Sequence, residues 1–126
     1  MSRSWRLISI VFLASMLGSP LLAQGAQPLQ GGQENLSVIR VAELPVQARE
    51  TLLAIKQGGP FAYPRDGVVF NNFEQVLPKR QRGYYHEYTV ETPGESNRGV
   101  RRIISGAAHE YYYTTDHYQT FKRILE

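Results

Sequence analysis

Three kinds of charged side chain occur in the second half of this sequence in an arrangement that suits acid–base chemistry. Glu87 lies in the run YYHEYTV, Arg98 and Arg102 lie in RGVRRII, and His117 lies in DHY. A carboxylate can accept a proton, an imidazole with an ordinary pKa of about 6.5 can donate one, and guanidinium groups can stabilise a charged phosphoryl group. These groups could take a proton from a ribose hydroxyl, hold a phosphate and protonate the leaving oxygen. The chemistry indicated is cleavage of RNA.

Strand geometry tests this grouping, because side chains on a strand alternate between its two faces. Arg98 and Arg102 share one face of a predicted strand, and Arg101 points the other way. If the hairpin turn is centred on residues 94–95, Glu87 lies opposite Arg102. A slip of one residue would move Glu87 to the other face. The plainer alternative is a surface salt bridge without a catalytic role.

The three histidines have different predicted roles. His117 lies in a predicted turn between two strands that contain tyrosines, from which its side chain can reach the face of the sheet. His86 lies on the strand face opposite to Glu87, so a structural role is expected for it. His109 is expected to be an ordinary loop residue.

One predicted helix precedes a series of predicted strands. Ala48, Leu52 and Ile55 recur at helical spacing within residues 46–57, and the Gly-Gly-Pro at 58–60 ends the pattern. Segments rich in Val, Ile, Thr and Tyr then alternate with turn residues, which predicts strands at 67–70, 84–92, 98–105, 111–114 and 118–125. This order predicts the α+β class, with an N-terminal helix packed on an antiparallel β-sheet.

The N-terminal residues have the pattern of a secretory signal peptide. Residues 1–6 contain two arginines and no acid, residues 7–17 are almost wholly apolar, and Gly-Ser-Pro follows. The apolar stretch is shorter than the roughly 20 residues that span a membrane, so a membrane anchor is the weaker interpretation. We expect a signal peptide at 1–23, a flexible leader at 24–37 and one folded domain at 38–126. The protein is then secreted, either outside the cell or into a periplasm.

Composition indicates how the domain is stabilised and how its charge is distributed. The 126 residues include no cysteine, so packing rather than disulfides must stabilise the domain. The net charge is +3, and removing Arg3 and Arg6 from the 14 basic residues leaves 12 against 11 acidic ones, or +1. Lys79, Arg80 and Arg82 nevertheless lie close together, and such a local patch can attract phosphate. A solvated charged face is the alternative.

Six segments, in order, resemble the small bacterial guanyl-specific ribonucleases, the family that contains barnase. They are LPVQARETLLAIKQGGPF, YPRDGVVFNNFE, LP at 77–78, YYHEYTV, TPG followed by RGVRRII, and TTDHYQTFKRI. The resemblance covers residues 44–124 and implies the microbial ribonuclease fold. It also implies a secreted endoribonuclease that cleaves single-stranded RNA 3′ of guanosine. The products would be a 2′,3′-cyclic phosphate and then a 3′-phosphate, with no metal or other cofactor.

The resemblance implies a role for each residue of the catalytic group. Glu87 would be the general base and His117 the general acid, with the two roles reversed when the cyclic phosphate is hydrolysed. Arg98 and Arg102 would stabilise charge on the phosphoryl oxygens. Tyr118 would contact phosphate or base.

The resemblance also implies a guanine-binding loop, whose residues are Phe70, Asn71, Asn72, Phe73 and Glu74. Main-chain N–H groups of this loop would meet the guanine O6, and the Glu74 carboxylate would accept from N1 and N2. Phe70 would offer an aromatic surface, and Asn72 would hold the conformation of the loop. Phe73 is a departure, because relatives often have a polar or small residue there. The cysteine pair of the extracellular relatives is also absent.

Expectations about partners and biological role follow from the resemblance. The substrate would be single-stranded RNA, the protein would be a monomer, and an intracellular inhibitor of the barstar type is a possible partner. A non-catalytic RNA-binding module is an alternative, and product analysis would separate it from an enzyme. The same nuclease used as an antibacterial toxin is a second alternative.

Overall fold

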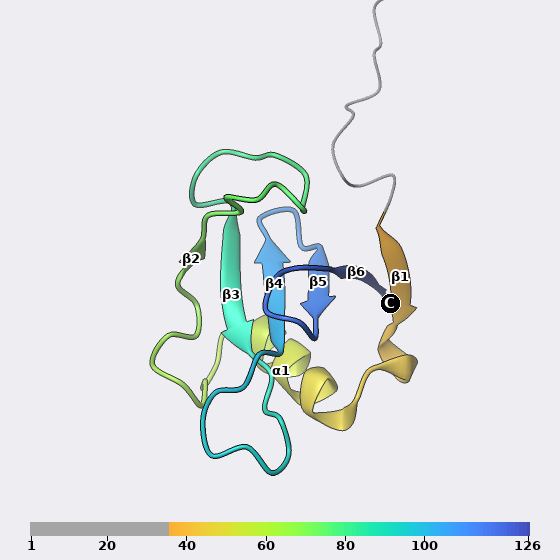
Figure 1. The fold of residues 1–126 in the computed structure, drawn as a ribbon, viewed down its shortest axis with the longest axis vertical. Helices are drawn as coiled ribbons and strands as arrows, with labels where there is room; N and C mark the ends of the chain where they lie inside the picture. The colour runs from red at the N-terminus through yellow and green to blue at the C-terminus, as the bar shows by residue number, and fades with distance from the viewer. Residues whose placement is uncertain (1–35) are drawn as a thin grey trace, which may run out of the picture.

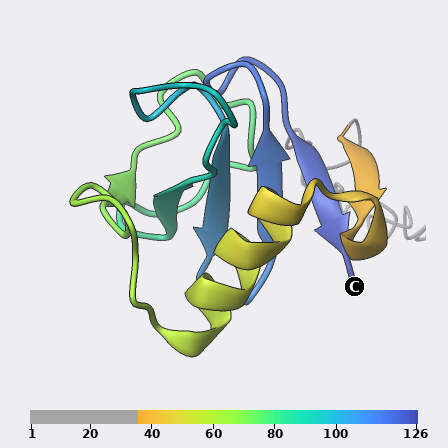
Figure 2. The same ribbon diagram turned by 90° about the horizontal axis from the view of Figure 1, so that it is seen from below.

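The computed structural model describes residues 36–126, in which one α-helix lies across one face of a six-stranded sheet (Figures 1 and 2). The predicted signal peptide at 1–23 and nearly all of the predicted leader at 24–37 lie outside the described residues. No helix within the described part is long and apolar enough to cross a membrane.

The sheet places its six strands in the order β1-β6-β5-β4-β3-β2. In chain order the elements are β1 (Ser37–Arg40), a 3-10 turn (Val41–Glu43), α1 (Val46–Gln57), β2 (Val69–Phe70), β3 (Tyr85–Thr89), β4 (Arg102–Gly106), β5 (Tyr111–Thr114) and β6 (Lys122–Leu125). All neighbouring strands are antiparallel except β1 and β6, which are parallel. The predicted α+β class with a helix on a sheet is confirmed. Strand β1, which was not predicted, makes the sheet mixed.

Helix α1 has the bounds that the sequence pattern predicts. Ala48 and Leu52 are buried on its inner face. The helix ends at Gly58, which has a left-handed conformation with φ of 79° and donates its N–H to the carbonyls of Ala54 and Ile55. Glycine adopts this conformation without the steric cost that a Cβ would add.

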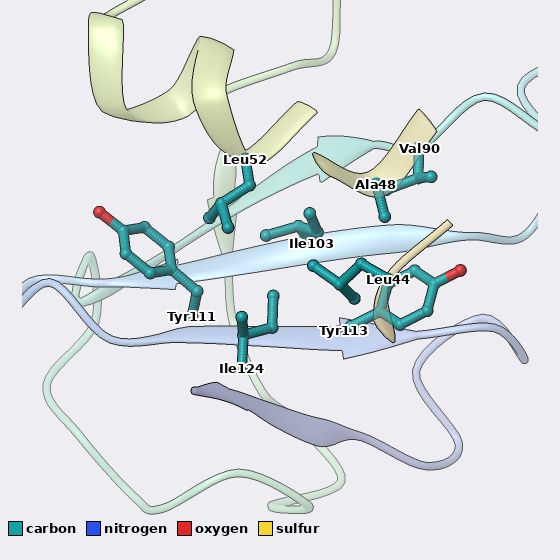
Figure 3. Close-up of a cluster of buried hydrophobic side chains, with 8 residues drawn as sticks. All are labelled: Leu44, Ala48, Leu52, Val90, Ile103, Tyr111, Tyr113 and Ile124. Atoms are coloured by element: carbon teal, nitrogen blue, oxygen red, sulfur yellow. The ribbon is translucent and has the colours of Figure 1, made fainter. Parts of the chain in front are cut away.

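Two hydrophobic clusters divide the faces of the sheet. The first lies between α1 and the sheet (Figure 3) and contains Leu44, Ala48, Leu52, Val90, Ile103, Tyr111, Tyr113 and Ile124. The second consists of Leu77, Tyr85, Ile104, Tyr112 and Phe121. Because side chains alternate along β4, Ile103 packs under the helix while Arg102 and Ile104 point to the opposite face. That opposite face carries Glu87.

The pairing of β3 with β4 differs from the predicted register. Glu87 lies opposite Ile104, and Thr89 lies opposite Arg102, so the predicted pairing of Glu87 with Arg102 is wrong by two residues. A shift of two residues preserves the face, and Glu87 and Arg102 still point to the same side. Strand β4 begins only at Arg102, so Arg98 lies in the long loop before it and not in a strand as predicted.

Candidate active site

Glu87 is a buried carboxylate in the middle of β3, with 7% of the residue exposed. Both main-chain polar groups of Glu87, its N–H and its carbonyl, are hydrogen-bonded to the segment before β2. Its N–H donates to the carbonyl of Val68 at 2.9 Å, and its carbonyl accepts from the N–H of Gly67 at 2.8 Å. The segment before β2 therefore fixes the position from which the carboxylate projects.

Two arginines approach the same carboxylate oxygen. Arg98 Nη2 lies 3.4 Å from Glu87 Oε1, and Arg65 Nε lies 3.8 Å from it. Arg98 is also anchored by Thr89, whose Oγ1 accepts from Nη2 at 2.8 Å and from Nε at 3.0 Å. Arg98 is thus close to Glu87 although it lies in a loop, because the β3 residue two positions further on holds it there.

Arg65 also lies at the site, although the sequence predicts no role for it. It lies in a turn that Asp66 ties to the sheet, with Asp66 Oδ1 accepting from the N–H of Thr89 at 2.7 Å. The Arg65 side chain is 65% exposed, which leaves its guanidinium accessible to a ligand. Neither hydrophobic periodicity nor strand alternation indicates such a residue, because it lies in a turn. The only sequence signal for it is its place within the segment YPRDGVVFNNFE.

Tyr118 contacts the second oxygen of the carboxylate. Its hydroxyl donates to Glu87 Oε2 at 2.9 Å. Burial raises the pKa of Tyr118 to about 12, and the negative charge of Glu87 adds to the rise. The hydroxyl therefore remains protonated at neutral pH and acts as a donor. Its ring packs against Phe70, with centroids 4.8 Å apart.

His117 lies beside this tyrosine in the turn after β5, as the sequence predicts. Both His117 and Tyr118 have positive φ angles, of 55° and 74°. Asp116 organises the turn by accepting from the hydroxyls of Thr114 and Thr120, and the bonds from Thr120 lower the pKa of Asp116. The main chain of His117 is also attached to the loop before β4, since its N–H donates to the carbonyl of Val100 at 3.1 Å.

Arg102 lies beneath the site and not at its surface, with only 3% of the residue exposed. Its Nη1 donates to the carbonyls of Gly99 and Arg101 at 2.9 and 2.8 Å. Its Nε has no hydrogen-bond partner among residues 36–126. Arg102 therefore braces the loop that holds Arg98 and contributes a buried positive charge.

The loop after β2 has a rigid anchor in Asn72. This residue is 9% exposed and has a φ of 53°. Its Nδ2 donates to the carbonyl of Leu77 at 2.9 Å, and its Oδ1 accepts from the N–H of Leu77 at 3.2 Å. Asn72 thus closes the loop on itself, and Phe73 and Glu74 remain exposed at its tip.

One pocket of about 350 Å³ brings most of the predicted residues together. Its lining includes Glu87, His117, Tyr118 and Arg65 together with all five residues of the 70–74 loop. Arg98 and Arg102 do not line it. The pocket therefore combines a carboxylate, an imidazole and a cation with an aromatic loop that has a second carboxylate.

The other two histidines lie away from this pocket. His86 Nδ1 is 2.8 Å from the carbonyl of Gly67, which gives it the structural position expected from its place in β3. His109 is an exposed loop residue with a φ of 62°. Within residues 36–126, no group of three or more His, Cys, Asp or Glu side chains is placed to hold a metal ion.

Known proteins similar to this chain are ribonucleases. A family model described as ribonuclease matches residues 28–125. Guanyl-specific ribonuclease St of Saccharopolyspora erythraea is 48% identical over 92 residues, which cover 73% of this chain and 91% of that protein. Guanyl-specific ribonuclease Sa of Kitasatospora aureofaciens is 58% identical over 85 residues, which cover 67% of this chain and 88% of that protein.

Solved structures of ribonuclease Sa2 share the fold. Its complexes with mononucleotides match with a TM-score of 0.71 and 49% identity, over 72% of this chain and 95% of that chain. Its complex with guanosine-2′-cyclophosphate matches with a TM-score of 0.69 and 50% identity, over 71% of this chain and 96% of that chain. The resemblance noted in the sequence is confirmed, and this chain belongs to the ribonuclease family that includes these guanyl-specific enzymes.

Proposed function

We propose that this chain is a secreted guanyl-specific endoribonuclease that cleaves single-stranded RNA after guanosine. The observation that carries the proposal is the pocket that Glu87, His117 and the 70–74 loop line together. It offers a carboxylate and an imidazole for proton transfer, and the aromatic ring of Phe70 for a nucleotide base. The guanyl specificity of ribonucleases St and Sa, and the guanosine-2′-cyclophosphate complex of ribonuclease Sa2, support the choice of guanosine.

In the first step, Glu87 removes the proton from the 2′-hydroxyl of guanosine, and the 2′-oxygen attacks phosphorus. The 5′-oxygen of the next nucleotide leaves with a proton from His117, and a 2′,3′-cyclic phosphate remains. In the second step, His117 takes a proton from water as the water oxygen attacks phosphorus. The bond between phosphorus and the 2′-oxygen breaks, Glu87 protonates that oxygen, and a 3′-phosphate results. Side chains present in the pocket can make all of these proton transfers, so we expect activity without a metal ion.

Positive charge around Glu87 suits the phosphate that must lie beside it. Arg65 and Arg98 both lie within 4 Å of the Glu87 carboxylate and could donate to phosphoryl oxygens. Arg102 acts from beneath through its buried charge and through the loop that it braces. Tyr118 keeps its proton, and its hydroxyl orients the carboxylate of Glu87, the general base.

Guanine would be bound by the loop of residues 70–74. The main-chain N–H groups of Phe73 and Glu74 make no hydrogen bond with any other residue of the described chain, so they are free to donate to O6. The exposed Glu74 carboxylate could accept from N1 and N2, and Phe70 provides an aromatic face beside Tyr118. Only an unpaired guanine can present these atoms to the loop.

The catalytic roles can be tested with Glu87→Gln and His117→Asn. Each variant should lose on the order of 10²–10⁴-fold in kcat on guanylyl-uridine with chelator present, the usual range for an acid–base group. Asparagine tolerates the left-handed conformation of residue 117, so the fold should survive. His109→Asn is the matched control, because His109 also has a positive φ and lies outside the pocket.

The result would be read from product ends and from far-UV circular dichroism. The enzyme should leave cyclic phosphate on guanosine, whereas a non-catalytic RNA-binding module would return the RNA intact. Full activity in folded Glu87→Gln would remove Glu87 from the role of base.

Guanine recognition is tested separately with Glu74→Ala. Loss of this carboxylate should lower kcat/KM on guanylyl-uridine about tenfold or more and change cleavage of adenylyl-uridine little, since the two substrates differ only in the base. Glu50→Ala, which removes an exposed acid from α1, is the control. An equal loss of kcat/KM on both dinucleotides would mean that Glu74 contributes to the cleavage reaction and not to recognition of guanine.

We also propose that the protein is exported. The charged and apolar pattern of residues 1–17 supports export, which N-terminal sequencing of the secreted product would test. We expect a monomer. A tight intracellular inhibitor would protect the producing cell, and the same chemistry would serve nutrient scavenging or use as a toxin.

A further inference from the structure

Phe73 is the most exposed large hydrophobic side chain of the described residues, at 87%. Single exposed apolar side chains are common on protein surfaces, but this ring lies at the tip of a loop that also borders two pockets. The loop is rigid because the neighbouring Asn72 is buried and hydrogen-bonded to Leu77. Phe73 is therefore a fixed aromatic surface without an aromatic partner among residues 36–126.

A second pocket, of about 280 Å³, lies on the other side of this loop. It shares Phe70, Asn71, Asn72 and Phe73 with the candidate active site, so the two pockets adjoin across the loop. The rest of its lining is Gln75, Lys79, Arg80, Gln81, Arg82 and Tyr85. Three of these side chains are basic and none is acidic, which makes the pocket a local site of positive charge in a nearly neutral domain.

The basic segment and the aromatic surface are held in a fixed relation. Asn72 Nδ2 also contacts the carbonyl of Pro78, which immediately precedes Lys79, and the hydroxyl of Tyr85 donates to the same carbonyl. The guanidinium of Arg80 lies over the ring of Tyr84, 5.4 Å from its centroid. Arg80 is thus partly oriented while its charge stays accessible.

We propose that Phe73 and the basic segment Lys79, Arg80 and Arg82 form an additional RNA subsite, in which a nucleotide next to the guanosine stacks on Phe73 and its phosphate binds the cations. Stacked bases and contacted phosphates are how proteins hold single strands without reading sequence. The continuity of this pocket with the guanine loop favours the same RNA strand as its occupant. The inference rests on the proposed function, because it takes the guanosine to lie in the adjoining pocket.

The test compares kcat/KM on guanylyl-uridine with kcat/KM on oligonucleotides that contain one guanosine and are extended with uridines on either the 5′ or the 3′ side. Extension on at least one side should raise kcat/KM about tenfold, and the two substrates identify which neighbour binds. Phe73→Ser should reduce that advantage about fivefold or more, and Phe73→Tyr, which retains the ring, should preserve it. The triple change of Lys79, Arg80 and Arg82 to Gln should reduce the advantage and weaken its dependence on salt.

Matched controls separate the subsite from general effects. Leu53→Ser removes another exposed apolar side chain, at 56%, from the opposite part of the fold. Changing the exposed Arg40, Arg49 and Lys122 to Gln removes the same number of charges elsewhere. Both controls should keep the advantage of the extended substrate.

Three results would overturn the subsite: no gain from extension in the unchanged protein, a gain that Phe73→Ser does not reduce, or an equal loss on short and long substrates. The second result would indicate that the exposed Phe73 contacts a protein partner and not RNA. Failure of the unchanged protein to prefer guanylyl-uridine over adenylyl-uridine would instead contradict the proposed guanine specificity. The effect of extension can still be measured on the dinucleotide that is cleaved, so the two failures are distinguishable.

Discussion

Glu87 has a defined partner on each of its carboxylate oxygens. Arg98 and Arg65 approach Oε1, and the hydroxyl of Tyr118 donates to Oε2. These partners come from three different loops, so the environment of the carboxylate depends on the whole face of the sheet. A surface salt bridge without a catalytic role would not require such burial or so many partners.

The hydroxyl of Tyr118 can be removed without changing the ring. In Tyr118→Phe, the charged carboxylate loses one hydrogen bond, a type of bond worth about 1.5–3 kcal/mol. We expect kcat on guanylyl-uridine to fall about tenfold to a hundredfold, while the packing of the ring against Phe70 is retained. Tyr88→Phe is the control, since it changes the opposite face of the same strand. A kcat equal to that of the unchanged protein would show that Glu87 does not need this donor.

At the scale of elements, loops carry most of the site and the sheet orders them. Glu87 comes from a strand, but Arg65, Arg98 and His117 lie in three separate turns or loops. Each of these loops is attached to a neighbouring strand or loop by at least one main-chain hydrogen bond, such as the bond from His117 N–H to the carbonyl of Val100 in the loop before β4. Rigid attachment of loops is what allows them to hold catalytic geometry.

The anchor of the guanine loop gives a prediction at this scale. Asn72→Ala should destabilise the protein by about 2–3 kcal/mol, because it leaves buried partners at Leu77 unsatisfied and puts a Cβ-bearing residue without local hydrogen bonds at a φ of 53°. KM for guanylyl-uridine should rise as the loop loosens. Urea denaturation and steady-state kinetics measure the two effects.

Asn72→Gly separates the two causes. Glycine loses the same hydrogen bonds but has no Cβ, so it should be more stable than the alanine variant by about 1 kcal/mol. Equal stability of the two variants would mean that backbone strain at this position is negligible.

The sequence predicts local elements well and their pairing less well. Helix α1 has its predicted bounds because its apolar spacing and the glycine after it are local signals. The predicted register of β3 and β4 is wrong by two residues because the loop that connects these strands is longer than a simple hairpin turn. Its Gly99 has a φ of 62°, and the side chain of Arg102 holds the carbonyl of this glycine. Contacts of this kind are tertiary and leave no periodic signal.

The same distinction explains the other differences. Strand β1 forms only by parallel pairing with β6, at the far end of the chain, and a four-residue segment does not signal such a partner. Arg65 was missed because it lies in a turn. Glu87, His117 and the guanine loop were named from their residue types together with the family resemblance, and the structure brings them to one pocket.

At the scale of the whole molecule, the sheet separates stability from chemistry. One face packs against α1, and the other carries a tyrosine-rich cluster that borders the site. Tyr85, Tyr112 and Tyr118 all belong to or pack against this second cluster. In a domain without cysteine, these buried rings contribute much of the packing that disulfides would otherwise support.

Stability should therefore fall steeply in alkali. Burial raises the pKa of Tyr112 and of Tyr118 to about 12 and raises that of Tyr85 as well. In the unfolded chain these tyrosines ionise near pH 10, so between about pH 10 and 12 the unfolded state binds fewer protons than the folded state. The free energy of unfolding should be unaffected by these groups below pH 10 and decrease from there to pH 12. Urea denaturation at intervals from pH 7 to 12 measures this curve.

Tyr112→Phe removes one of the titrating groups, so its curve of unfolding free energy against pH should run parallel to that of the unchanged protein at neutral pH and decline less steeply above pH 10. Identical slopes above pH 10 would contradict the role assigned to burial of Tyr112.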